Sequence, residues 1–216
     1  MLSGTLLQKS GHVRFAVLGI AMLLVPVSEC LAQAEWQRTV KVIAPIQENT
    51  VTRALTDTVV GMAETQDLQL RRTPESDTAA SLAPIRSALS EEGLALTSAT
   101  DVFITYRFTL KGSRLQRRIL DLHFIYRPSA EQGEDIPILY LNLTENDLYQ
   151  RLIVEKGLPS SVNEVAFQPF EEAISFHSLQ ETATVVQVGN QIIRDPKQAA
   201  SEKRQIAGTI RELTYD

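Results

Sequence analysis

The sequence is poor in cysteine and glycine, with one cysteine, Cys30, and ten glycines in 216 residues. A single cysteine cannot form an internal disulfide, which excludes a small secreted module that depends on disulfides for its stability. The chain also lacks a phosphate-binding glycine loop and the G-x-S-x-G, H-E-x-x-H and paired C-x-x-C patterns. We therefore expect no catalytic residue, metal or cofactor. An enzyme whose residues come together only in the fold stays open as the alternative.

Positive charge is the scarcer sign. The chain has 21 Lys and Arg against 26 Asp and Glu, a formal net charge of −5. Binding to nucleic acid is dominated by basic side chains that neutralise phosphates. We therefore expect no nucleic-acid partner.

Long apolar runs are confined to the N-terminus. The run Phe15–Val25 follows Lys9 and Arg14, which is the order of charged and apolar regions in a secretory signal peptide. A membrane-spanning helix needs about 20 apolar residues. Pro26 and Glu29 interrupt this run. An uncleaved anchor is therefore the weaker alternative.

Small residues mark the expected cleavage position. Ala32 and Ala34 stand three residues and one residue before a cut that precedes Glu35. A lipid-modified Cys30 is disfavoured because the charged Glu29 precedes it. We predict a signal peptide over residues 1–34 and a periplasmic or secreted chain, 35–216, with no cysteine and no membrane span. Trp36, next to the cut, is either an aromatic anchor or disordered.

The hydrophobic pattern of residues 35–216 predicts one mixed α/β (α+β) domain with residues 129–135 as the only candidate seam. We expect a mixed sheet with a long amphipathic hairpin, helices packed on it and a C-terminal helix. Expected strands are 39–46, 68–72, 101–111, 114–127, 136–143 and a hairpin over 182–194. Expected helices are 50–64, 82–92, 144–156, 169–178 and 196–213, with a short turn at 161–164.

The long hairpin carries the clearest pattern in the chain. Residues 101–111 alternate strictly, and Gly112-Ser113 suits a two-residue turn. This turn pairs Tyr106 with Ile119 but then directs the apolar residues from Leu120 onward toward solvent. We therefore predict either a β-bulge near Arg117-Arg118 or a three-residue loop, which would restore the apolar face.

The predicted polar face of this hairpin concentrates positive charge on an acidic chain. The residues are Arg107, Lys111, Arg114, Arg117 and Arg127. Local charge of this kind attracts an acidic protein partner or lipid headgroups at a membrane surface. The alternative is a solvated strand face that its charges protect from aggregation.

Two histidines remain after the predicted cut. His123 shares a strand face with Asp121, so the two could act as acid and base or as metal ligands, although no third ligand is near in sequence. His177 is expected at the end of the 169–178 helix, where a cation interacts favourably with the helix dipole. The alternative function is accordingly an enzyme or small-ligand-binding protein with a site near Asp121, His123 and His177.

Residues 38–127 resemble a group of periplasmic α/β modules. The resemblance rests on three segments, Val40-Lys41-Val42-Ile43-Ala44-Pro45, Ala54-Leu55-Thr56-Asp57 and Leu70-Arg71-Arg72. They look like the first strand, helix and second strand of the TolB N-terminal, LpoB and CsgG group, with Ile46 in place of an aromatic residue. The resemblance implies a non-catalytic accessory or adaptor protein that docks on an envelope assembly or polymer-synthesis partner. It transfers no functional residue.

Overall fold

The structure is a computed structural model that describes residues 36–65, 68, 70–76, 81–128, 134–159 and 167–215. These residues belong to one compact unit, Gln33–Asp216. The predicted signal peptide, its cleavage site at Ala34 and Glu35, the turn at 161–164 and residues 129–133 of the candidate seam lie outside the described residues. The fold belongs to the predicted mixed α/β class, with a C-terminal helix.

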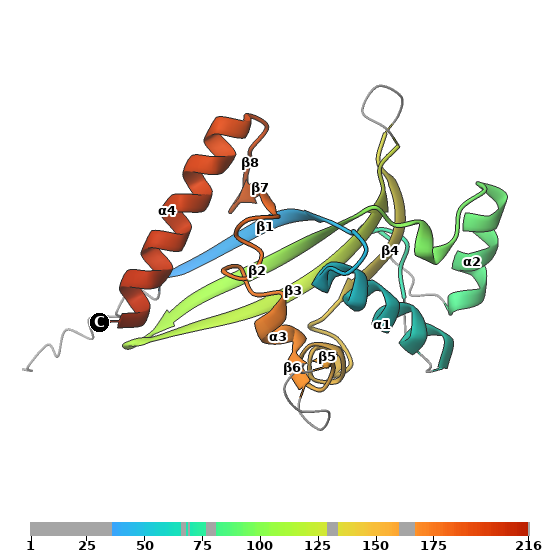
Figure 1. The fold of residues 1–216 in the computed structure, drawn as a ribbon, viewed down its shortest axis with the longest axis horizontal. Helices are drawn as coiled ribbons and strands as arrows, with labels where there is room; N and C mark the ends of the chain where they lie inside the picture. The colour runs from blue at the N-terminus through green and yellow to red at the C-terminus, as the bar shows by residue number, and fades with distance from the viewer. Residues whose placement is uncertain are drawn as a thin grey trace, which may run out of the picture. The chain divides into compact units, whose positions relative to one another are not determined.

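A six-stranded antiparallel sheet forms the centre of the fold, in the order β4-β3-β2-β1-β7-β8 (Figure 1). Its strands are β1 (Gln37–Pro45), β2 (Asp101–Lys111), β3 (Arg114–Tyr126), β4 (Ile136–Asn142), β7 (Thr184–Val188) and β8 (Gln191–Ile192). The two short strands β5 (Gly157–Pro159) and β6 (Phe167–Pro169) pair separately. The predicted strand at 68–72 is reduced, in the described part, to an isolated bridge between Arg71 and Tyr140.

The two faces of the sheet differ in chemistry. One face, the core face, buries Val40, Ile104 and Leu122, which belong to a single apolar cluster together with residues of the helices. On the other face, the polar face, residues that pair across β1, β2 and β3 form rows. These rows are Gln37-Thr109-Gln116, Thr39-Arg107-Arg118, Lys41-Thr105-Asp121 and Ile43-Phe103-His123.

The helices contribute their apolar residues to the core cluster. They are α1 (Val51–Thr65), α2 (Leu82–Glu91), α3 (Phe170–Ala173) and α4 (Pro196–Tyr215), with a 3₁₀ turn at Leu96–Ser98 and a π-helical turn at Tyr149–Val154. α4 packs against β7 and reaches β3 (Figure 1). Asp195 begins α4 as predicted, because its Oδ1 accepts hydrogen bonds from the backbone N–H groups of Lys197 and Gln198.

The hairpin has the predicted turn, but the bulge lies elsewhere. Gly112 has φ of 59°, and Leu110 pairs with Leu115 across the two-residue turn. Tyr106 still pairs with Ile119, and Thr105 then pairs with Asp121, so Leu120 is the extra residue. The predicted position at Arg117-Arg118 is wrong by two to three residues. The bulge restores the apolar face from Leu122 onward.

Two predicted helices are largely replaced by turns. Asn146 and Asp147 have φ of 50° and 54°, so Asp147 cannot act in the first turn of a helix, and only the π-helical turn forms before Gly157. The predicted 169–178 helix is limited to α3. The Ser175 hydroxyl accepts the backbone N–H of Ser178, and this local bond competes with continuation of the helix.

The buried hydroxyl of Tyr106 links the sheet to the segment that follows α3, and this link can be tested directly. Tyr106 is fully buried, and its hydroxyl donates to the backbone carbonyl of Ile174 at 2.6 Å. Tyr106→Phe leaves that carbonyl without its donor, which costs about 1–3 kcal/mol of unfolding free energy. Denaturant unfolding measures the change. Tyr126→Phe, on the same face but only partly buried, is the control, and an equal loss in both variants would contradict the prediction.

Candidate functional site

Cations are paired directly across the hairpin on the polar face. Arg107 lies opposite Arg118, and Lys111 lies opposite Arg114 at the turn. Like charges directly opposite one another destabilise a sheet. The four side chains are exposed, and none forms an ion pair with the described residues. We call Arg107, Lys111, Arg114 and Arg118 the cationic patch.

A shallow hollow of about 280 Å³ lies at this patch. It is lined by Gln37, Arg107, Thr109, Lys111, Gln116, Arg117 and Arg118. The uncharged members add amide and hydroxyl donors from β1, β2 and β3. The described lining contains no carboxylate, so the hollow suits an anionic group.

Two of the five basic residues predicted for this face lie elsewhere. Arg117 pairs with Phe108 on the core face, because the chain keeps its alternation from Leu115 to Ile119 and the bulge comes only afterwards. Arg127 lies beyond the other end of β3, where its Nε and Nη2 donate to Asp135 at 2.8 Å each. This ion pair lowers the pKa of Asp135. Arg118 is not among the predicted residues, although the predicted two-residue turn already places it opposite Arg107.

Asp121 and His123 share the polar face as predicted, but neither donates a hydrogen bond to the other in the described part. Asp121 accepts from the Thr105 hydroxyl at 2.9 Å, and Nε2 of His123 is buried with no described partner. Burial raises the pKa of Asp121 and lowers the pKa of His123, and the Lys41 ammonium lowers both. Both groups are partly buried, and the folded state shifts the pKa of each in the direction of its neutral form.

Asp121 provides a pH-dependent prediction for stability. Because its pKa is raised in the folded state, the folded state favours the protonated carboxyl. That contribution is fully present below pH 3.8, the ordinary pKa of the carboxyl, and is lost as pH rises through the folded-state pKa. Asp121→Asn should therefore raise Tm at pH 7 and have little effect near pH 3. Calorimetry at the two pH values measures this, and a lower Tm at pH 7 would contradict it.

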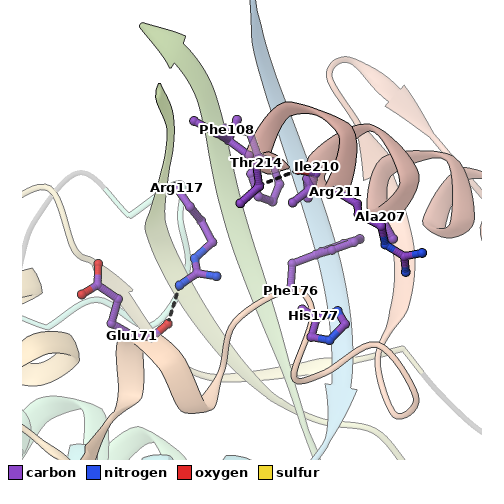
Figure 2. Close-up of a pocket in the computed structure, with 10 residues that line it drawn as sticks. Phe108, Arg117, Glu171, Phe176, His177, Ala207, Ile210, Arg211 and Thr214 are labelled. Carbon is purple, nitrogen blue, oxygen red and sulfur yellow. Dashed lines mark hydrogen bonds between the residues drawn. The ribbon is translucent and has the colours of Figure 1, made fainter. Parts of the chain in front are cut away.

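His177 lies on the other side of the sheet from Asp121 and His123. It lines a cavity of about 480 Å³ on the core face, between the hairpin, α4 and the segment after α3 (Figure 2). The lining residues are Phe108, Leu115, Arg117, Glu171, Phe176, His177, Ala207, Ile210, Arg211 and Thr214. The three residues of the predicted alternative site are therefore not brought together.

Trp36 directly precedes β1 and is held by a backbone hydrogen bond to β2. Its carbonyl accepts the backbone N–H of Leu110 at 2.8 Å, and its side chain packs against the core cluster. Leu110 pairs with Leu115, which lines the cavity. The structure thus supports the anchor interpretation, with the sheet itself as the place of attachment.

Among the described residues, no group of three or more His, Cys, Asp or Glu side chains could hold a metal ion. None of the helices in the described ranges is both long and apolar enough to cross a membrane. Neither the models of known protein families nor the curated protein sequences gave a match to this chain.

Proposed function

We propose that the protein is an exported, non-catalytic accessory or adaptor protein that binds an acidic protein partner in the cell envelope through the cationic patch. The observation that carries this proposal is the direct pairing of Arg107 with Arg118 and of Lys111 with Arg114. Export rests on the N-terminal signal pattern.

A purely protective role accounts for the patch less well. Charge on a strand keeps sheets from pairing edge to edge, but isolated or alternating charges achieve this. Placing cations opposite one another adds repulsion across the strands, which an anion in the hollow between them would relieve. The overall acidity of the chain, −5, makes this surface the exception.

The test is affinity capture from envelope extract with the purified protein as bait. The variant Arg107→Glu/Arg118→Glu reverses two charges in the patch, and Lys197→Glu/Arg204→Glu makes the same change in charge at exposed positions of α4. Partners that depend on the patch should fall about tenfold or more with the first variant and remain with the second. Recovery should also fall as salt rises. An unchanged set of partners with both variants would refute the proposal.

A further inference from the structure

Arg117 breaks the pattern of the core face. Leu115, Arg117 and Ile119 of β3 lie on the same face of the sheet. Arg117 pairs with Phe108, which is 1% exposed. Arg117 as a whole residue is half-buried, in a position where alternation and pairing both favour an apolar side chain. Removing a charge from water is costly unless a partner compensates for it. Departures from a local rule of this kind concentrate at functional sites.

Few of the N–H donors of the Arg117 guanidinium have a hydrogen-bond partner among the described residues. Its Nη2 donates to the backbone carbonyl of Glu171 at 2.9 Å, and no other hydrogen bond is present among the described residues. An arginine has five N–H donors. The Glu171 carboxylate instead accepts from the Tyr149 hydroxyl at 2.9 Å and points away from the other lining side chains (Figure 2). Donors of Arg117 therefore remain available to an anion in the cavity.

The remaining walls are mainly apolar. The rings of Phe108 and Phe176 meet edge to face, with centroids 5.8 Å apart and an interplanar angle of 85°. Ala207 and Ile210 of α4 close the side opposite the hairpin (Figure 2). A volume of about 480 Å³ falls within the range of roughly 300–1,000 Å³ that small-molecule sites occupy.

We infer that this cavity binds a single-chain amphipathic carboxylate of the fatty-acid class. The carboxylate lies on Arg117, with the His177 imidazole as a second polar group, and the chain lies along Phe108, Phe176 and Ile210. Arg117 supplies the cation on the strand side of the cavity, and Phe108, Phe176, Ala207 and Ile210 line the way to α4, where the second cation, Arg211, is exposed. An acidic peptide would bring several charges to a lining that places its aromatic and aliphatic side chains between Arg117 and α4.

This site shares only Arg117 with the hollow at the cationic patch. The cavity is on the core face, and neither Arg107 nor Arg118 lines it. Arg117 lines both hollows, so the partner experiment above leaves it unchanged. Failure of either proposal can then be recognised independently of the other.

Trp36, the only tryptophan in the chain, reports on the site because its partner Leu110 pairs with Leu115 in the cavity wall. The purified protein is titrated with decanoate, decanol and decyltrimethylammonium, followed by Trp36 fluorescence and calorimetry. Decanoate should bind at least about tenfold more tightly than the cationic analogue, as expected for a charge-assisted hydrogen bond. Equal binding of the two, or no saturable binding of decanoate, would overturn the inference.

The variant Arg117→Met keeps an unbranched side chain and removes the charge. It should weaken decanoate binding about tenfold or more and leave decanol binding unchanged. Arg204→Met, an exposed position of α4 outside the cavity lining, is the matched control. If Arg117→Met does not fold, intermolecular NOEs between decanoate and the Phe176 ring in the unaltered protein give the same answer. Unchanged decanoate affinity in Arg117→Met, or absence of those NOEs, would exclude the site.

Discussion

Arg107→Glu should make the protein more stable and a poorer binder at the same time. The substitution converts the Arg107–Arg118 pair from repulsive to attractive. Opposite charges across antiparallel strands stabilise by roughly 0.2–1 kcal/mol, whereas like charges destabilise. The same substitution removes a cation from the hollow and should lower partner binding. Urea unfolding and affinity capture measure the two effects.

The double variant Arg107→Glu/Arg118→Glu completes this test. It restores like charges to the pair, now negative, and it also removes the contact of the Arg118 guanidinium with the Tyr149 ring, 5.1 Å from the ring centroid. Its stability should therefore fall below that of Arg107→Glu while binding is lost further. A double-mutant cycle on the unfolding free energies isolates the pair from effects on neighbouring residues. A stability that falls in the single variant would mean that Arg107 has a stabilising partner and that its charge is structural.

These variants also address why positions 107 and 118 both carry arginine. A strand face selected only for stability would carry opposite charges at positions 107 and 118, since the geometry offers that gain directly. Holding two cations there lowers stability slightly. An interaction that uses both cations provides a reason for the arrangement. Adding anionic vesicles to the capture experiment distinguishes a protein partner from the alternative of lipid headgroups.

The local parts of the fold could be predicted from sequence because period-two alternation and turn chemistry act over a few residues. The strand Asp101–Lys111, the turn at Gly112 and the Asp195 cap are all confirmed. The site of the bulge could not be predicted, because an extra residue at any of several positions restores the same apolar face. Because the bulge was expected near Arg117, this residue was predicted on the polar face, whereas it lies on the core face.

The cavity lay beyond sequence reasoning for a different reason. Its walls come from Phe108, Arg117, Phe176 and Ile210, which belong to two strands, a loop and the C-terminal helix. No spacing in the chain brings these positions together. The predicted 169–178 helix also misplaced His177, because α3 ends at Ala173 and the Ser175 hydroxyl accepts the Ser178 N–H in the turn that follows. His177 belongs to that turn and lines the cavity. In the sequence, only the turn-forming serines Ser175 and Ser178 indicated that the helix would end early.

Among glycine-to-alanine substitutions at the described glycines, Gly157→Ala should produce the largest loss of stability. A Cβ at Gly157 would lie 1.9 Å from the backbone oxygen of Gln168 and 2.6 Å from its carbonyl carbon. Backbone atoms on a paired strand cannot move aside as a flexible side chain can. We expect β5 and β6 to separate, at a cost of about 3 kcal/mol or more. Thermal or urea unfolding measures the change.

Gly61→Ala is the matched control, because the same methyl group in α1 meets nothing within 4 Å. Alanine favours a helix over glycine by about 1 kcal/mol, so the control should be stabilised. The loss at Gly157 should also reach the cavity, since β6 leads directly into α3 and the backbone N–H of Phe170 donates to Lys156 at 2.9 Å. Separation of β5 from β6 would displace Glu171 and with it the hydrogen bond of Arg117. Decanoate affinity in Gly157→Ala should therefore fall while capture through the cationic patch persists. An unfolding free energy that is unchanged in Gly157→Ala would contradict the close approach of β5 to β6.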